Sequence, residues 1–113
     1  TTTPAAMVGL MRALLLGNVL APASRERLAG WMENSTTGLK RLRAGLPPGW
    51  RAGDKTGNGA NGAANDVAIA WPPGRPPILI ASYVSGAEVG EEARHAAVKE
   101  ILQEQVPVKG TDP

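Results

Sequence analysis

Lys55, Thr56 and Gly57 are the residues of this sequence whose types and spacing most favour chemistry. They end a run of residues typical of a β-strand, so an ammonium group, a hydroxyl group and a glycine would stand together at a strand end. Such a set lets a ligand carboxylate bind close to the backbone. The same residues also fit an ordinary strand end with a solvated lysine, and a Lys-Thr-Gly motif alone does not separate the two interpretations.

Other kinds of site find little support. The chain has no cysteine and a single histidine, His95, so it has no thiolate and cannot form a zinc site by itself. We therefore expect no metal and no cofactor. His95 falls in a predicted helix with no Ser or Asp arranged around it, which favours an exposed helical histidine over a general base. Residues 57–62 are rich in Gly and Asn but join two predicted strands, which argues against a phosphate-binding loop.

Charge and hydropathy argue against two classes of partner. The net charge is only +2, and the 12 Lys and Arg residues are spread along the chain, which does not predict a nucleic-acid surface. The longest apolar stretches, 8–16 and 67–71, are far shorter than the roughly 20 residues of a membrane-spanning helix. We expect neither a nucleic acid nor a membrane as partner. The opening Thr1-Thr2-Thr3-Pro4 has no initiator Met and no signal-peptide pattern, so we expect it to lie inside a mature protein.

Helices are predicted in the first half of the chain. Thr3 and Pro4 suit the start of a helix that should reach about Leu16. Its apolar stripe is formed by Met7, Leu10, Met11, Leu14 and Leu15. A second helix is predicted from an N-cap at Ser24 to Asn34, with a buried side of Leu28, Trp31 and Met32. Residues 39–44 could add one or two helical turns before a rigid connector.

The second half predicts an antiparallel sheet. Residues 51–58, 65–71 and 78–85 read as three strands separated by Gly-, Asn- and Pro-rich turns. The third strand is apolar on both sides of its alternation, so we expect the sheet to be covered on both faces. Residues 88–105 predict a closing helix, followed by a frayed tail. The predicted fold class is therefore α+β, with helices first, then a three-stranded antiparallel sheet and a C-terminal helix.

The surroundings of the Lys-Thr-Gly motif resemble class A serine β-lactamases along essentially the whole chain. Before the motif stand Ser24-Arg25-Glu26, Trp31-Met32 and Pro48-Gly49-Trp50-Arg51, and after it stand Gly62-Ala63-Ala64-Asn65-Asp66 and Ile69-Ala70-Trp71-Pro72-Pro73. The opening residues 1–7 are similar to the segment that leaves the omega-shaped active-site loop of that family. The resemblance implies a penicillin-recognising serine hydrolase fold, here partial. Residues 1–50 would belong to its all-helical lobe and residues 51–113 to its sheet lobe.

The resemblance also implies roles for the motif. Lys55 would supply positive charge to the substrate carboxylate and the proton-transfer network, and the Thr56 hydroxyl would hydrogen-bond that carboxylate. Gly57 would keep the strand edge open. The backbone N–H of Asn58 would serve the oxyanion hole, at a position where relatives often have Thr, Ser or Ala. Because that donor belongs to the main chain, asparagine should retain it.

One departure from the family pattern concerns arginine. Many relatives brace the substrate carboxylate with an arginine on the following strand, but residues 62–65 contain none. We expect Arg41 to replace it, while a solvated basic turn is the alternative interpretation of residues 40–43. Arg43 and Asp54 are expected to form a structural pair.

The family's Ser-x-x-Lys and Ser-Asp-Asn motifs do not occur in these 113 residues, and its catalytic glutamate has no counterpart here. We therefore predict the C-terminal part of an enzyme that hydrolyses penicillins and cephalosporins through an acyl-serine intermediate, conferring antibiotic resistance but inactive alone. Its partners would be β-lactams and the N-terminal half of the same enzyme, in the periplasm or outside the cell. The alternatives are a fragment of a penicillin-binding peptidase or transpeptidase, and a non-catalytic remnant or interaction domain.

Overall fold

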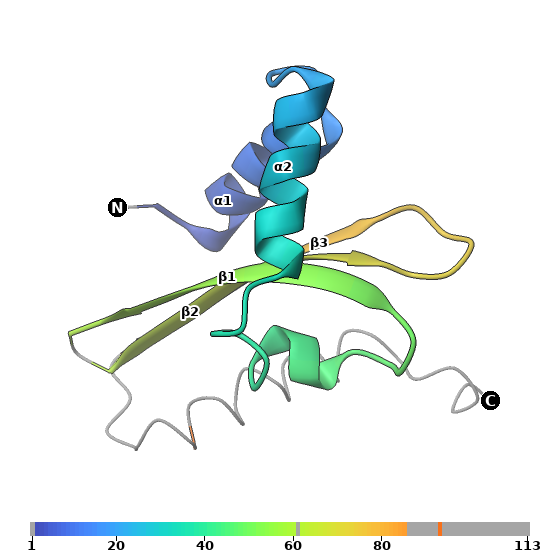
Figure 1. Cartoon of the computed structure of the whole chain (residues 1–113). Coiled ribbons are helices and arrows are strands. Elements are labelled where there is room, and N and C mark those ends of the chain that lie inside the picture. Colours follow the sequence, from blue (N-terminus) through green and yellow to red (C-terminus); the bar gives the residue numbers. More distant parts are fainter. Residues whose placement is uncertain (1, 61, 86–92, 94–113) are drawn as a thin grey trace.

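The chain forms helices followed by one antiparallel sheet, in a computed structural model that describes residues 2–60, 62–85 and 93 (Figure 1). The predicted α+β class is confirmed. The elements in chain order are α1 (Pro4–Met11), the π-helix η1 (Arg12–Leu16), α2 (Pro22–Glu33), the 3-10 helix η2 (Leu42–Gly45), β1 (Arg51–Gly59), β2 (Ala63–Trp71) and β3 (Ile78–Val84). Apart from residue 93, the predicted helix at 88–105 lies outside the described residues, as do its histidine and the predicted tail.

The three strands are antiparallel and lie in the order β1-β2-β3. Lys55 is opposite Val67, and Thr56 is opposite Asp66. The first hairpin is longer than predicted, because the ladder continues until Gly59 pairs with Ala63. Among the described strands β1 is at an edge, so one side of its backbone has no neighbouring strand there.

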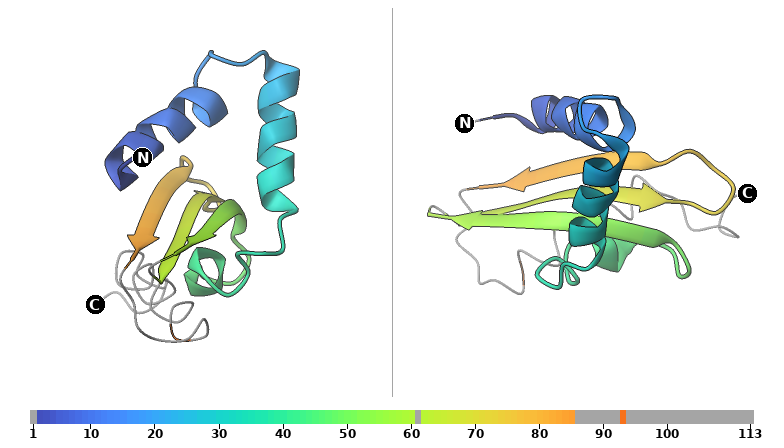
Figure 2. Two further views of the ribbon diagram at one scale, coloured as in Figure 1. Left: turned by 90° about the vertical axis from the view of Figure 1, so that its left-hand side faces the viewer. Right: turned by 45° about the horizontal axis from the view of Figure 1, so that its top comes forward.

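One face of the sheet is covered by α1, η1 and α2 (Figure 2). The buried centre of this layer consists of Met11, Leu15, Met32 and Ile69. Burying each of these side chains stabilises the fold by roughly 1.5–3 kcal/mol. The opposite face carries η2, where the fully buried Leu42 packs on Ala68 of β2. The described part of the sheet is thus contacted by helices on both faces, as the apolar third strand predicted.

The first helix begins as predicted, but its buried face is narrower. The Thr3 hydroxyl accepts a hydrogen bond from the backbone N–H of Ala6 at 3.1 Å, and helical structure continues through η1 to Leu16. Leu10, expected in the stripe, is 50% exposed. The core layer is contacted by Met7, Met11 and Leu15, which follow one another at four-residue spacing. Leu10 lies beside that line on the helix surface.

The second helix differs from prediction at both its start and its face. It begins at Pro22 with Ala21 as N-cap, so the expected cap at Ser24 is wrong. Proline at the first helical position already has the helical φ, which moves the start forward. Trp31, expected to be buried, is 67% exposed. Leu28 and Met32 face the sheet four residues apart, which turns Trp31 away by about 100° from Met32.

The C-terminal end of α2 lies directly on β1. A Cβ at Gly53 would stand 2.6 Å from the backbone nitrogen of Glu33, so only glycine permits this approach. Arg51 fixes the same contact, because its Nε donates to Glu33 Oε2 at 2.5 Å and its guanidinium lies 4.1 Å from the centre of the Trp71 ring. The helix therefore positions the first half of the strand that carries Lys55.

Candidate functional site

Lys55 lies in an open pocket of about 470 Å³ that is lined by residues of all three strands and of α1. The pocket is lined by Lys55, Thr56 and Gly57 of β1, by Asn65 and Val67 of β2, by Tyr83 of β3 and by Met7 of α1, with Thr2 and Asp66 completing the lining. Lys55 is exposed, and its Nζ donates to the backbone carbonyl of Thr56 at 2.6 Å. A cation, a hydroxyl-bearing residue and a glycine therefore meet at one hollow beside the edge strand.

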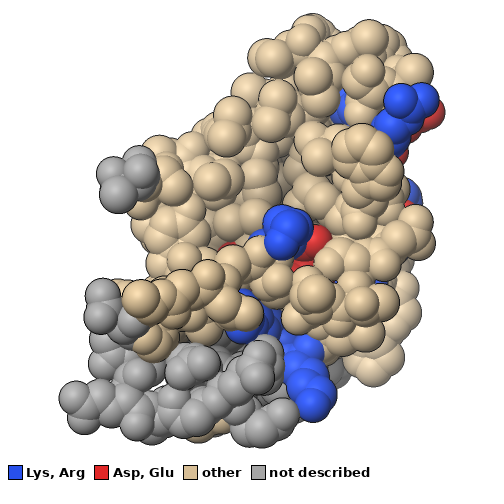
Figure 3. All heavy atoms as spheres, turned by 60° about the vertical axis from the view of Figure 1, so that its left-hand side comes forward, with Lys and Arg blue, Asp and Glu red and all other residues tan. Residues whose placement is uncertain are grey.

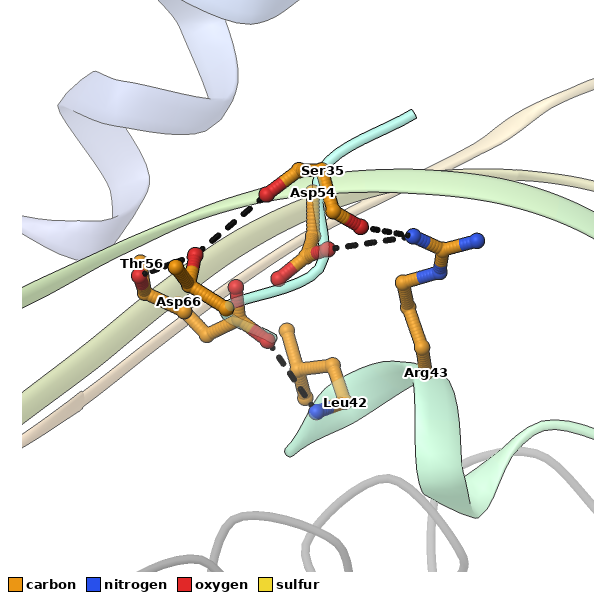
Figure 4. Close-up of polar contacts among 7 residues, drawn as sticks. Ser35, Leu42, Arg43, Asp54, Thr56 and Asp66 are labelled. Carbon is orange, nitrogen blue, oxygen red and sulfur yellow. Dashed lines mark hydrogen bonds and ion pairs between the residues drawn. The ribbon is translucent and has the colours of Figure 1, made fainter. Parts of the chain in front are cut away.

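The hydroxyl of Thr56 forms a hydrogen bond with a residue outside the sheet. It donates to Oγ1 of Thr37 at 2.9 Å, and Thr37 Oγ1 lies 3.3 Å from Oγ of Ser35 (Figure 4). Ser35 and Thr37 come from the loop that follows α2. This loop thereby brings two further hydroxyl groups to the strand that carries Lys55.

Arg41 and Asn58 are in contact. Nη2 of Arg41 donates to Oδ1 of Asn58, and Nη1 donates to the backbone carbonyl of Asn65 at 2.9 Å. Arg41 is only 1% exposed, whereas Asn58 is exposed. The arginine is therefore not a solvated turn residue but lies behind the strand, and any contact with a substrate stays a prediction.

Arg43 and Asp54 form the expected pair. Arg43 Nη1 lies 3.7 Å from Oδ1 of the fully buried Asp54 and donates to the carbonyl of Ser35 at 2.8 Å (Figure 4). Gly38 packs against the same carboxylate, because a Cβ at this position would stand 1.5 Å from Asp54 Oδ2. The loop from Ser35 to Gly38 is thus fixed on Asp54, one residue before Lys55 in the chain.

Asp66 is a second buried carboxyl group beside the site. One of its oxygens accepts the backbone N–H of Leu42 at 3.1 Å, which joins η2 to β2. Burial, followed by the neighbouring Asp54 carboxyl, raises the pKa of Asp66 to about 9. Asp66 is therefore protonated at neutral pH. The buried pair of Asp54 and Asp66 consequently carries less negative charge than two ionised aspartates would.

Of the predicted site residues, Lys55, Thr56 and Gly57 line one pocket, whereas Asn58 and Arg41 contact each other and are not among the residues that line it. Lys55, Thr56, Gly57 and Asn58 follow one another along β1, and Arg41 reaches the last of them from η2's N-terminal side. The sequence does not predict Thr37, Asn65 or Asp66 as site residues. The one sequence signal for Thr37 is the Ser35-Thr36-Thr37 turn, because clustered hydroxyl residues favour turns. Figure 3 shows Lys and Arg atoms in several separate places on one face rather than in a single basic patch.

Within the part of the chain that the structure describes, there is no group of three or more His, Cys, Asp or Glu residues that could hold a metal ion. No helix among the described residues is long and apolar enough to cross a membrane.

Comparison with known proteins gives the family to which this fold and site belong. Residues 1–104 match the model of the beta-lactamase enzyme family, so the chain belongs to that family. Its relatives are class A β-lactamases. A solved class A enzyme of the last common ancestor of Gram-negative bacteria superposes with a TM-score of 0.88 at 54% identity, over 90% of this chain and 39% of that one.

Natural relatives agree with this assignment. A β-lactamase of Nocardia asteroides is 47% identical over 110 residues, which cover 97% of this chain and 36% of the relative. A β-lactamase structure from Xanthomonas campestris has a TM-score of 0.86 at 51% identity, over 90% of this chain and 38% of that chain. The chain thus spans about a third of the length of the curated relatives it matches.

Proposed function

We propose that this chain forms the carboxylate-binding wall of a class A β-lactamase that hydrolyses the β-lactam amide of penicillins and cephalosporins. The family match supports this, and the observation that carries it is the pocket at Lys55, Thr56 and Gly57 beside the edge strand β1. The reaction requires a serine nucleophile that attacks the β-lactam carbonyl and is then released by water. The nucleophile and its bases would come from a second, N-terminal part, and this chain alone would be inactive.

In this proposal Lys55 and Thr56 bind the substrate's acid group. The Lys55 ammonium is exposed in the pocket and supplies charge, while the Thr56 hydroxyl supplies a directed hydrogen bond. Gly57 leaves the strand open at this point because it adds no side chain; even a built Cβ would meet nothing closer than 4.0 Å. An acid group would thereby be held while the reactive amide lies further along the strand.

Asn58 would donate its backbone N–H to the oxyanion that forms during acylation. Such a donor typically contributes about 3 kcal/mol of transition-state stabilisation. Its side chain is bound by Arg41, which supports the local backbone from behind. Arg41 is too buried for open contact with solvent. We therefore propose that its guanidinium contributes to carboxylate binding through the positive potential that it adds behind Asn58.

The proposal is tested by joining this chain to the N-terminal portion of the Nocardia asteroides relative that the alignment leaves uncovered, either fused or co-expressed. We call this the reassembled protein. It should hydrolyse a chromogenic cephalosporin, whereas each part alone should not. A location in the periplasm or outside the cell, and resistance to β-lactams in a host carrying the reassembled gene with a leader sequence, form part of the same proposal.

Lys55→Ala in the reassembled protein should lower kcat/KM on the order of a hundredfold, because a charge-assisted contact in a partly desolvated site is lost. Arg75→Ala is the matched control, since Arg75 is an exposed cation in the turn between β2 and β3. Hydrolysis that is unaffected by Lys55→Ala would contradict the assigned wall.

A further inference from the structure

Three hydroxyl groups from two segments meet beside the carboxylate-binding wall. Thr56 lies on β1 and Ser35 lies in the loop after α2 (Figure 4). Thr37 belongs to the same loop as Ser35. The oxygen atoms of Thr56 and Thr37 are 2.9 Å apart, and those of Thr37 and Ser35 are 3.3 Å apart. Thr37 is exposed and Thr56 is half-buried, so the outer end of this hydroxyl chain is open to an incoming ligand.

The direction of these hydrogen bonds leaves one donor for a ligand. A hydroxyl group has one hydrogen to donate and two lone pairs that accept. Thr56 gives its hydrogen to Thr37, and the hydrogen of Thr37 is therefore directed elsewhere, either to Ser35 or outward. Because Ser35 and Thr37 can each act as donor, Ser35 can give its hydrogen to Thr37 when Thr37 turns toward a ligand.

A carboxylate would change this arrangement. An ionised oxygen is a stronger acceptor than a neutral hydroxyl, so both threonine hydroxyls gain by turning toward it. Their oxygens are close enough to reach the two oxygens of one acid group, or to share one of them. Chains of hydrogen bonds polarise one another, so the donation from Ser35 to Thr37 would strengthen the outward bond.

We infer that Thr37 is a second hydroxyl ligand of the substrate carboxylate and that it determines the preference for free acids over neutral analogues. This inference rests on the proposed function. It adds a residue from the loop after α2 to a wall otherwise made by consecutive residues of β1. It also assigns Ser35 as a positioning residue, because Ser35 would act only through Thr37.

The test uses the reassembled protein with Thr37→Val, which removes the hydroxyl at nearly constant shape, and Thr37→Ser, which restores it. Thr37→Ala is a second deletion in case the valine is poorly accommodated. Thr36→Val is the matched control, since Thr36 is an exposed neighbour in the same loop. KM and kcat are measured for a β-lactam acid and for its methyl ester.

Removing the Thr37 hydroxyl should raise KM for the acid about tenfold, the effect of one lost hydrogen bond to a charged group. KM for the ester should change less than about twofold, Thr37→Ser should behave like the unsubstituted protein, and Thr36→Val should have no effect. An equal change for acid and ester would show a purely structural role and overturn the inference. A lower KM for the acid would also overturn it, because Thr37 would then compete for the Thr56 hydrogen.

The inference and the proposed function fail in different ways. Hydrolysis that depends on Lys55 but not on Thr37 overturns the inference alone. Absence of hydrolysis by the unsubstituted reassembled protein overturns the proposed function and the inference with it.

Discussion

Arg41 lies behind Asn58 and donates from Nη2 to its side-chain oxygen, so a buried guanidinium supports an exposed residue of the binding strand. The second amino group of the same guanidinium binds the carbonyl of Asn65 on β2. One side chain thus connects the segment before η2 with both strands of the first hairpin. The sequence predicts both residues as site residues, but for separate roles: Arg41 for the substrate carboxylate and Asn58 for the oxyanion hole.

Arg41→Ala is expected to destabilise the reassembled protein by roughly 3 kcal/mol. The substitution leaves the carbonyl of Asn65 and the amide of Asn58 without their donor and removes a cation from the surroundings of Asp66. Urea unfolding followed by circular dichroism measures the change. Arg75→Ala, at an exposed turn, should change the unfolding free energy by less than about 0.5 kcal/mol, and an equal loss in both variants would contradict the role of Arg41.

Asn58→Ala should separate the two functions of that residue. The backbone N–H remains, so kcat should fall less than about tenfold if the main chain supplies the oxyanion donor. The side-chain contact to Arg41 is lost, which should change KM for β-lactam acids more than KM for their esters. Steady-state kinetics on both substrates checks this. A hundredfold loss of kcat with unchanged KM would show that the asparagine side chain acts in the transition state.

Asp66 predicts a specific pH dependence of stability. Its pKa is raised on folding from 3.8 to about 9, chiefly by burial and then by Asp54, so the folded state binds the proton more tightly than the unfolded state. This contribution to the free energy of unfolding is complete below about pH 4 and is lost as the pH rises toward about 9. Urea unfolding of the reassembled protein should accordingly show lower stability at about pH 8.5 than at about pH 6.

Asp66→Asn is the corresponding control, because the amide stays neutral and its oxygen can still accept the backbone N–H of Leu42. The variant should lose most of the pH dependence and be more stable than the unsubstituted protein at the alkaline end. A slope that survives unchanged in Asp66→Asn would assign it to another group.

Two glycine-to-alanine substitutions should have opposite effects. Gly38→Ala would place a methyl group 1.5 Å from Asp54 Oδ2, so the loop or the buried carboxylate must move, at a cost of about 2 kcal/mol or more. Gly30 lies inside α2, and a Cβ there meets nothing within 4 Å. Gly30→Ala should stabilise by roughly 0.5–1 kcal/mol because alanine favours the helix. Thermal melts of the two variants, compared with the unsubstituted protein, test the pair.

The chain on its own should melt with poor cooperativity and bind a hydrophobic dye strongly. Large apolar side chains of the helical layer, among them Leu10, Val19 and Trp31, are exposed in the structure. Apolar side chains exposed in this number favour burial against a partner. Adding the N-terminal portion should reduce dye binding and sharpen the transition. A sharp two-state melt of the lone chain would argue against a missing partner.

Local signals predicted the elements well where a single residue decides the backbone. Thr3 caps α1, and the runs of strand-forming residues place β1, β2 and β3 within a few residues. Packing is decided by partners far along the chain, which is why the burial of Trp31 and Leu10 was predicted wrongly. At the start of α2, Pro22 and Ser24 were competing signals, and the proline φ prevailed.

The candidate site also combines residues that the sequence predicts with residues that only the fold brings together. Lys55, Thr56, Gly57 and Asn58 could be named from sequence because they are consecutive and carry a family motif. Thr37 lies nineteen residues before Thr56, and only the folded loop brings their hydroxyls together. The raised pKa of Asp66 likewise depends on burial beside Asp54, which the alternation of β2 alone does not reveal.

Lys55 and Thr56 are neighbours on one strand, so the pleat directs their side chains to opposite faces of the sheet. Both residues nevertheless line one pocket, because it lies beside the edge strand. Under the proposed function, a ligand held by both must straddle the rim of the sheet with a small anionic end group.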